Sequence, residues 1–298
     1  MSTLILITGA YGFVGKNLCQ YLVANGYQCD ALDLAESVCD AVPYRHHYTW
    51  DNLDLLLPHL KKYAAIIHLA GKAHDLKNVS DPQSYFDINV GLTKKIFDLT
   101  HQQVAKFIYF STSKVLDSTT PYAESKREAE HYLADQAIIL RPAMIHGPGN
   151  KGNLNLLWKI TQYHFPWPLA AFENKRSFAS IDNICAVVLA LIQRGKNGIY
   201  TVADDTPLST NQIIQMMASV QGRKAHLWRI PKAIMRWCSK VGDLFHLPLN
   251  SERLHKLTED SLLDNTLLKK HLNWDTMPID AINGMFKTLQ SFKSGESR

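Results

Sequence analysis

The first 140 residues alternate between short apolar runs and stretches with helical periodicity, and this alternation constrains the fold more than any other feature. The predicted strands lie at Leu4–Ile7, Phe107–Phe110 and Ile138–Leu140, which are apolar throughout, and at Tyr27–Leu32 and Ala64–Leu69, which also carry polar residues. Continuous apolar runs are typical of strands that are buried on both faces of a parallel sheet. Strands that alternate with helices need crossover connections. The sequence therefore predicts an α/β fold with a doubly wound, mostly parallel sheet.

The pattern changes after Pro142. A turn-rich segment over 146–153 is followed by predicted helices at about 154–163 and 182–193, a strand at 198–202, and a helix through Val220 that Ser209 or Thr210 can cap. A basic amphipathic helix follows Pro231, and the remainder is mainly helical. We divide the chain into a strand–helix domain over 1–147, to which 180–203 return, and a smaller helix-rich domain formed by 148–179 and 204–298.

Three glycines separate the first predicted strand from the first predicted helix. Gly9, Gly12 and Gly15 allow a tight turn, and they let a diphosphate approach the backbone N–H groups of the helix N-terminus. Asp33 ends the second strand, 18 residues after Gly15, where a carboxylate accepts hydrogen bonds from an adenosine ribose. The first domain is therefore predicted to be a Rossmann-type domain that binds NAD(H) in preference to NADP(H), because Asp33 would repel a 2′-phosphate.

A tyrosine and a lysine share one face of the helix predicted at about 122–134. Thr120 can cap this helix, Pro121 suits its first position, and Tyr122 and Lys126 lie four residues apart. An ammonium group near a phenol favours phenolate, so we expect Lys126 to lower the pKa of Tyr122 and to prepare it for acid–base work. Ser111, Thr112 and Ser113 end the strand 107–110, and a hydroxyl there could bond the same substrate oxygen.

Together these motifs resemble the extended short-chain dehydrogenases/reductases, and within them the NAD-dependent epimerase/dehydratase family. The resemblance rests on Gly9/Gly12/Gly15, Asp33, His68–Gly71, Asn89, Ser111–Val115, Tyr122 with Lys126, and Leu140–Pro142. Three later motifs are similar to members that act on nucleotide-sugars, namely Gly147–Asn153, Arg176–Asn183 and Leu272–Trp274. The smaller domain is then expected to bind a UDP- or dTDP-sugar in polysaccharide biosynthesis.

The resemblance implies a role for individual residues of this chain. Thr112, Tyr122 and Lys126 match the catalytic residues, and Tyr122 and Lys126 also match cofactor contacts. The other implied cofactor contacts are Gly9, Tyr11, Gly12, Phe13, Val14, Asp33, the adenine-side pair Asp51 and Asn52, the segment Leu69, Ala70 and Gly71, and Asn89. The implied substrate contacts are Lys72, Thr112, and the two diphosphate-binding residues Asn153 and Arg176.

The chain departs from the family pattern around the catalytic threonine. Val115 is followed by Leu116 and Asp117 instead of Tyr-Gly, and only ten positions separate Thr112 from Tyr122, where relatives carry a longer loop that helps to wall the sugar pocket. Sugar dehydratases place Asp-Glu after the threonine, whereas this chain has Ser113 and Lys114, which argues against dehydration.

Two reactions at C4 of a nucleotide-sugar remain. We expect a UDP-hexose 4-epimerase, and an NAD(P)H-dependent 4-keto-sugar reductase is the alternative. A non-catalytic cofactor sensor of the same fold is less consistent with a chain that keeps both Tyr122 and Lys126.

Charge, hydropathy and the cysteine and histidine positions argue against a nucleic-acid-binding, membrane-spanning, disulfide-bonded or metal-binding protein. The net charge of +5 does not call for a nucleic-acid partner, and the longest apolar run, Ile184–Ile192, is too short to span a bilayer. The five cysteines (Cys19, Cys29, Cys39, Cys185 and Cys238) form no C-x-x-C pair, which favours free thiols in a cytoplasmic protein. We expect no metal site, because His46, His47, His68 and His74 lack partners at ligand spacing. The resemblance also allows a homodimer.

The helix after Pro231 has two plausible roles. One stripe carries Ile230, Ile234, Trp237, Val241 and Leu244, and another face carries Lys232, Arg236 and Lys240. Such a helix could make peripheral contact with a membrane. We favour instead a helix whose apolar stripe packs on the core and whose basic face is solvated.

Overall fold

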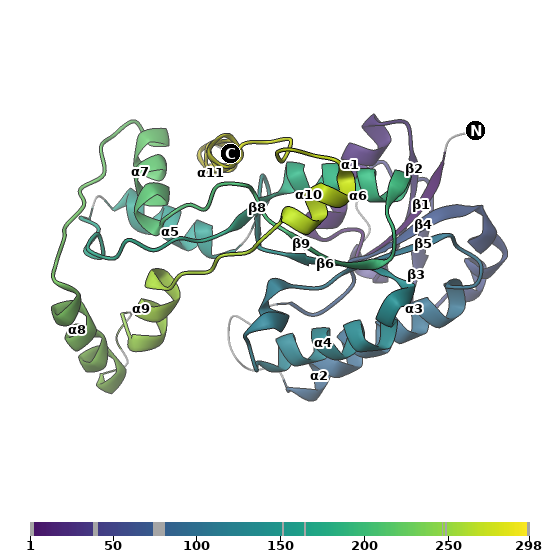
Figure 1. The fold of residues 1–298 in the computed structure, drawn as a ribbon, viewed down its shortest axis with the longest axis horizontal. Coiled ribbons are helices and arrows are strands. Elements are labelled where there is room, and N and C mark those ends of the chain that lie inside the picture. The colour runs from purple at the N-terminus through teal and green to yellow at the C-terminus, as the bar shows by residue number, and fades with distance from the viewer. Residues whose placement is uncertain are drawn as a thin grey trace. The chain divides into compact units, whose positions relative to one another are not determined.

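The computed structural model describes residues 3–37, 41–73, 81–150, 152–163, 165–245, 247 and 249–296. Cys39 and His74 lie outside these residues. The chain forms two compact units (Figure 1). The first comprises Met1–Ala143, Asn183–Val202 and Asp264–Thr276, and the second comprises Met144–Asp182, Ala203–Leu263 and Met277–Arg298.

The first unit is built on a seven-stranded sheet with the order β3-β2-β1-β4-β5-β6-β9, in which every neighbouring pair is parallel. The strands are β1 (Leu4–Thr8), β2 (Gln28–Asp33), β3 (His47–Thr49), β4 (Tyr63–His68), β5 (Lys106–Phe110), β6 (Ile138–Pro142) and β9 (Gly198–Val202). The predicted doubly wound, Rossmann-type sheet is confirmed. Thr8 stands opposite both Leu32 and His68, so the carboxyl ends of the central strands are level and form one edge.

Helices cover both faces of this sheet, with α3 and α4 on one face and α1 and α6 on the other (Figure 1). The α-helices of this unit are α1 (Phe13–Ala24), α2 (Gln83–Phe86), α3 (Leu92–Thr100), α4 (Pro121–Leu133), α6 (Ile181–Arg194, which enters from the second unit) and α10 (Thr266–Leu272). Shorter helical turns are η1 (Ala35–Ser37), η2 (Leu53–Leu55), η3 (Leu57–Lys62), η4 (Asp87–Gly91), η5 (Ser113–Leu116) and η6 (Ala134–Gln136).

Local signals in the sequence set several element boundaries. Thr120 caps α4 by accepting from the Ala123 N–H, and Pro121 occupies the first turn, as predicted. Gly26 follows α1 with a φ of +84°, a conformation that favours glycine. Short β3 and the helical stretch 83–100 were not predicted.

The core on one side of the sheet lies beneath α3 and α4. Ile96 and Phe97 of α3 and Ala129 and Leu133 of α4 pack on the buried strand residues Leu6, Ile66, Phe107, Tyr109 and Ile139. This packing fixes α4, which carries Tyr122 and Lys126, against the middle of the sheet.

The second unit holds the two-stranded parallel sheet β7 (Met144–His146) and β8 (Phe178–Ser180), with α5 (Asn153–Gln162), α7 (Thr210–Val220), α8 (Lys232–Leu244), α9 (Ser251–Thr258) and α11 (Ala281–Glu296). Its core joins Trp158 of α5, Met217 of α7, and Met285 and Leu289 of α11. Ser209 begins α7 with a complete capping box, as one of the two predicted caps.

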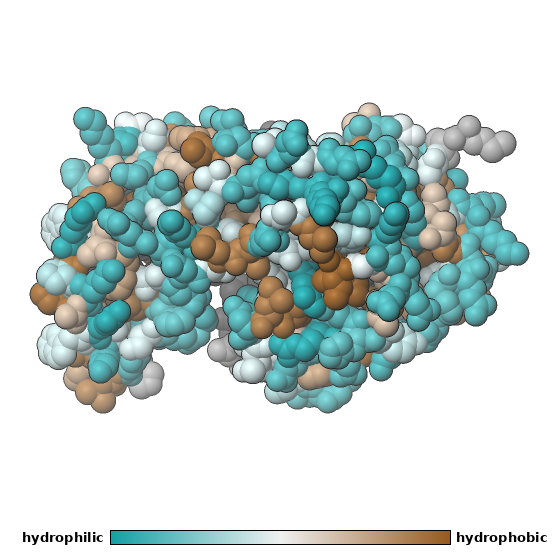
Figure 2. Space-filling view, in the orientation of Figure 1, coloured by the Kyte–Doolittle hydropathy of each residue, from teal (hydrophilic) through white to brown (hydrophobic). Residues whose placement is uncertain are grey.

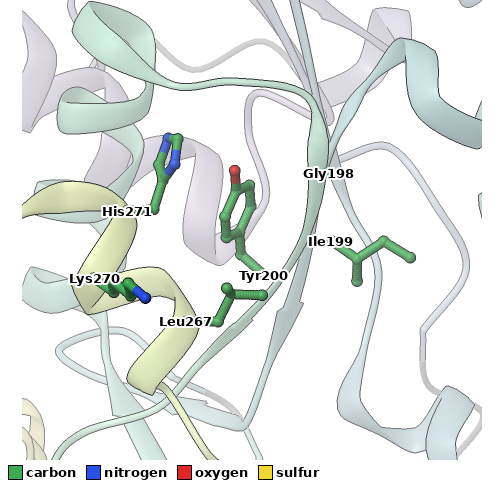
Figure 3. A pocket seen from close by; sticks show the side chains of 6 residues that line it. All are labelled: Gly198, Ile199, Tyr200, Leu267, Lys270 and His271. Carbon is green, nitrogen blue, oxygen red and sulfur yellow. The ribbon is translucent and has the colours of Figure 1, made fainter.

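Residues 264–276 correct the predicted division of the chain, which assigned 204–298 as a whole to the smaller domain. This segment contains α10, which packs beside the edge strand β9 in the first unit. The rings of Tyr200 and His271 are 5.0 Å apart, and the Lys196 N–H donates to Nε2 of His271. Figure 3 shows these residues around a groove that includes Gly198, Leu267 and Lys270. The groove lies at the start of β9, away from the carboxyl edge.

The helix α8 also differs from the prediction that its apolar stripe packs on the core. Only part of its apolar stripe packs inward: Ile230 contacts the core and Val241 is half-buried, whereas Ile234, Trp237 and Leu244 are 51%, 67% and 72% exposed. Met235, Ser239 and Gly242 are the buried residues of this helix. In the described part of the chain, no helix combines the length and the apolar character needed to cross a membrane.

Candidate active site

The glycine loop lies at the carboxyl edge of the sheet, between β1 and α1. Gly9 has a φ of +63°, and a Cβ on it would come within 2.7 Å of the Ala70 nitrogen. A Cβ on Gly15 would come within 2.4 Å of the Ala10 carbonyl oxygen. Both positions therefore require glycine, because the segment after β4 and the first turn of α1 approach the loop directly.

A tyrosine that the sequence analysis missed braces this loop. The Tyr44 hydroxyl lies 2.7 Å from the Ala10 carbonyl oxygen and 3.1 Å from that of Gly15. The ring of Tyr44 also meets the ring of Tyr11 edge-on. Nothing in the local pattern singles out Tyr44, because it acts on residues about 30 positions away.

Asp33 reaches the glycine loop, as its place at the end of β2 predicts. Its Oδ2 accepts from the Tyr11 N–H at 2.8 Å, and its Oδ1 accepts from the Leu34 N–H at 2.8 Å. Asp51 and Asn52 follow β3, the neighbouring strand, at the same edge. Asn52 there accepts from the Thr49 N–H, so its amide oxygen serves a turn, and Asp51 is exposed.

His68 holds the next segment in place as a neutral ring. It is fully buried between the hydroxyls of Thr8, at 2.7 Å, and Thr93, at 2.9 Å. Burial, with a smaller contribution from the nearby charge of Lys126, lowers the pKa of His68 to about 3. The Thr8 hydroxyl also accepts from the Ala70 N–H, so this network positions the Leu69–Gly71 backbone, which the resemblance places under the cofactor.

Thr112 and Tyr122 come together at the end of β5. Thr112 caps η5, and its hydroxyl interacts with the Tyr122 phenol in a way that lowers the phenol's pKa. Burial has the larger effect and raises the pKa of Tyr122. This direction corrects the sequence-based expectation that Lys126 lowers that pKa. The physical reason is that removal of the phenol from water disfavours the charged phenolate, and that the lysine ammonium donates to another group.

Lys126 donates to the carbonyl oxygen of Phe110 at 2.8 Å. Its Nζ also lies 4.7 Å from the centre of the Tyr109 ring. The side chain is buried, and this burial lowers the pKa of Lys126 to about 8, while Glu130 one turn further on opposes the change. The lysine therefore joins α4 to the last residue of β5, beside the catalytic candidates.

Asn89 joins three segments of the site. Its Oδ1 accepts from the Lys72 N–H at 2.8 Å, and its Nδ2 donates to the Lys72 carbonyl and to the Ser125 hydroxyl. A Cβ on Gly71 would lie 2.8 Å from the same Oδ1, so the glycine lets this amide approach. Ser125 lies between Tyr122 and Lys126 on α4 and was not among the predicted residues.

Other side chains surround Tyr122. The Tyr85 ring meets it edge-on at 6.4 Å, and the Lys114 Nζ lies 5.8 Å from its ring centre. Lys72 contacts the neighbouring Tyr85 as well. Its Nζ donates to the Ser84 hydroxyl and lies 5.1 Å from the centre of the Tyr85 ring. The ring that carries the candidate acid–base hydroxyl therefore has both an aromatic ring and a cation as close neighbours.

Arg127 fixes the short segment between Thr112 and Tyr122. Its guanidinium donates to the Val115 carbonyl at 2.8 Å and to the Ser118 carbonyl at 2.9 Å. The sequence analysis identified the short segment but did not predict that Arg127 stabilises it. In the sequence, Arg127 is marked only by its position directly after Lys126.

The two predicted diphosphate-binding residues belong to the second unit. Arg176 pairs with Leu208 through its backbone, and its Nη1 donates to the Lys256 carbonyl at 2.6 Å. Burial lowers the pKa of Arg176, and Glu259 opposes this change. Asn153 begins α5. Because Asn153 and Arg176 belong to a different unit from Tyr122, it stays a prediction that they bind the same substrate molecule.

The first unit fits a dinucleotide. The loop carries two glycines that admit no Cβ, Gly12 precedes α1 without a side-chain cap among the described residues, and Asp33 stands beside the loop. The hydroxyl of Ser111, at the end of β5, is buried without a hydrogen-bond partner in the part of the chain that the structure describes. No group of three or more His, Cys, Asp or Glu side chains among the described residues is arranged to hold a metal ion.

Comparison with known proteins extends these observations to the whole chain. The pattern of the NAD dependent epimerase/dehydratase family matches residues 5–203. UDP-glucose 4-epimerase of Vibrio cholerae is 29% identical over 99% of this chain and 97% of its own length. GDP-6-deoxy-D-mannose reductase of Pseudomonas aeruginosa is 23% identical over 79% of this chain and 86% of its own length. The solved structure of the Bordetella bronchiseptica enzyme WbmF in complex with NAD+ has the same fold, with a TM-score of 0.75 at 19% identity, and the match covers 99% of this chain and 94% of that one.

Proposed function

This chain belongs to the NAD-dependent epimerase/dehydratase family, and we propose that it interconverts the C4 epimers of a UDP-hexose. One observation carries the proposal: a buried lysine, a tyrosine and a threonine whose hydroxyl lowers the pKa of that tyrosine meet at the end of β5. They lie in the unit whose glycine loop and Asp33 fit a dinucleotide. This arrangement supports proton transfer at a sugar hydroxyl next to a bound redox cofactor.

Tyr122 is the proposed acid–base group. Burial keeps the phenol protonated in the free protein, because it raises the pKa of Tyr122. To remove the proton from O4 of the sugar, the phenol must first become phenolate, which the Thr112 hydroxyl favours. The same phenol returns the proton when the keto group is reduced again. Thr112 can also hold the O4 atom by its hydroxyl.

NAD, when bound, supplies the hydride acceptor at C4. The chain's own contribution is to hold that cofactor at the glycine loop and to present Tyr122 beside it. Asp33 supports NAD(H) over NADP(H), because its carboxylate already faces the Tyr11 N–H of the loop and would repel a 2′-phosphate. The described cysteines are free thiols, which fits an enzyme that works in the cytoplasm.

The carrier of the sugar is proposed as UDP, with dTDP as the nearest alternative. The similarity to a UDP-glucose 4-epimerase over nearly the whole chain supports UDP. Arg176 is the proposed diphosphate contact, since a guanidinium forms paired hydrogen bonds to phosphate oxygens.

A 4-keto-sugar reductase is the second candidate, because the chain is also similar to GDP-6-deoxy-D-mannose reductase. Tyr122 would then give its proton once, and the nicotinamide would be consumed. The two reactions thus differ in whether the cofactor is regenerated on the enzyme.

The test measures turnover without added cofactor. The purified protein is first heat-denatured in one sample, and the released nucleotide is identified by mass spectrometry. A second sample is incubated with UDP-glucose that carries deuterium at C4. An epimerase should release NAD, form UDP-galactose with no cofactor added, and retain the deuterium, because the hydride that leaves C4 returns to it. Dependence on stoichiometric NADH or NADPH with a 4-keto-sugar would reject the epimerase and support the reductase.

A further inference from the structure

The helix α8 has three distinct faces. Met235, Ser239 and Gly242 are buried, and they recur at helical spacing on one face. Ile234, Trp237 and Leu244 form the apolar stripe on a second face. Between these two faces, on the remaining side, lie Lys232, Arg236 and Lys240, all exposed.

Close backbone packing explains why the apolar stripe is outside. A Cβ on Gly242 would lie 1.9 Å from the carbonyl oxygen of Leu249, so the glycine face meets the following segment directly. Ser239 makes the same approach, with its hydroxyl 3.3 Å from that of Ser251. The small residues fix which face packs inward, and the larger apolar side chains are left on the opposite side.

The exposed apolar surface continues beyond α8. Trp237 and Leu244 are followed by Phe245, which is 66% exposed, and Leu247, which is 48% exposed. Trp228, just before the helix, is 57% exposed. Figure 2 shows brown apolar side chains over α8 and its end, next to teal hydrophilic ones. Single exposed apolar residues are ordinary, but a run of aromatic and aliphatic side chains along one helix marks a binding surface.

The segment of the chain that leads into this surface and forms most of α8 carries only positive charges. No Asp or Glu occurs from Thr206 to Gly242, whereas six Lys and Arg residues do: Arg223, Lys224, Arg229, Lys232, Arg236 and Lys240. Asp243 is the acidic residue on α8, and its carboxylate accepts from the backbone and the hydroxyl of Ser251. Arg229 pairs with an acid, Glu173.

We propose that α8, together with Phe245 and Leu247, binds the surface of an anionic lipid bilayer. Trp237, Leu244 and Phe245 would enter the headgroup and acyl boundary, and Arg236 and Lys240 would contact lipid phosphates. A basic helix with Trp and Leu on its other face has the composition of helices that lie in a membrane interface. A second copy of this chain is a poorer occupant, since twofold pairing would bring two basic faces together.

The proposal is tested with vesicles and does not depend on the reaction. The purified full-length protein is sedimented with vesicles of phosphatidylglycerol and phosphatidylcholine, and with vesicles of phosphatidylcholine alone. We expect binding to the first kind only, weakened by salt. Trp237→Glu with Leu244→Glu should lower the partition coefficient by more than tenfold. Arg236→Glu with Lys240→Glu should lower it to a similar extent, because each basic residue near such a surface contributes about fivefold.

Matched controls separate the surface from general effects. Leu267→Glu changes an apolar residue of similar exposure, 63%, on α10, and Lys61→Glu changes an exposed lysine of the other unit. Both should bind vesicles like the wild type.

Turnover of a soluble UDP-sugar without vesicles should be the same in all variants, which keeps this test apart from that of the proposed function. Wild-type binding no stronger to anionic than to neutral vesicles would overturn the proposal. So would a Trp237→Glu, Leu244→Glu variant that binds normally, or a wild-type dimer that this variant converts to monomer without any vesicle binding.

Discussion

The Nζ atom of Lys126 lies 2.8 Å from the carbonyl oxygen of Phe110. This hydrogen bond connects the second turn of α4 to the last residue of β5. The lysine ammonium therefore contacts a backbone carbonyl group at the carboxyl edge of the sheet instead of the phenol of Tyr122. Burial there lowers the pKa of Lys126 to about 8. Below that pH the folded protein carries a buried charge that the unfolded chain would expose to water, which costs stability.

We expect Lys126→Met to lose activity without losing stability at about pH 7. The pKa of Lys126 is lower in the folded protein than in the unfolded chain, so its destabilising effect is fully present below about pH 8 and fades as the pH rises toward 10.5. The variant lacks this effect, which amounts to at most about 3 kcal/mol. Urea unfolding at about pH 7 and about pH 10 should therefore show an advantage for the variant that shrinks with pH.

Lys61→Met is the control for that experiment, because Lys61 is exposed. Its free energy of unfolding should follow that of the wild type at both pH values. A Lys126→Met protein that is strongly destabilised at neutral pH would mean that the bond to Phe110 outweighs the cost of burying the charge.

We expect Tyr122→Phe to keep the fold and the cofactor while turnover falls by about 10²–10⁴-fold, the usual contribution of a positioned acid–base group. Tyr132→Phe is the matched control on the same helix, since the Tyr132 hydroxyl donates to Asp98 at the surface. Steady-state turnover and NAD content of the purified proteins are the measurements. Normal turnover in Tyr122→Phe would remove Tyr122 from the chemistry.

We expect Asp33→Asn to narrow the preference for NADH over NADPH by about tenfold or more, because it removes a negative charge that would face the 2′-phosphate. The amide can still accept the Tyr11 or Leu34 N–H, so the loop should keep its conformation. Dissociation constants for both cofactors, measured by nicotinamide fluorescence, check this. Asp54→Asn, an exposed change in the same unit, should leave the ratio alone. An unaltered ratio in Asp33→Asn would place the ribose elsewhere.

We expect Arg176→Ala to raise KM for the nucleotide-sugar much more than it lowers kcat. The diphosphate is remote from C4, so its contact contributes about equally to the bound substrate and the transition state. Lys175→Ala changes the neighbouring exposed residue and is the control. Because Arg176 also donates to the Lys256 carbonyl, thermal unfolding of both variants must be compared. Equal KM values in a folded Arg176→Ala protein would exclude the assignment.

The local parts of the fold follow from the sequence by itself. Some backbone conformations depend on only a few neighbouring residues, and a local pattern can therefore predict them. The structure contains the predicted glycines at 9 and 15, the start of α4 at Thr120 and Pro121, and the cap of α7 at Ser209. The continuous apolar strands likewise require a parallel sheet covered on both faces. Level carboxyl ends then bring Asp33 to the glycine loop, and Thr112 to Tyr122.

Only the tertiary structure decided which partner each side chain meets. Tyr44 braces a loop distant in sequence, Lys126 bonds a carbonyl group, and α10 joins β9 instead of the second unit. The stripe of α8 is exposed because close contact at Gly242 and Ser239 takes the inner face. Hydrophobic periodicity specifies that a helix has an apolar stripe, but the direction that the stripe faces depends on the fit between surfaces far apart in the chain, which no local pattern encodes.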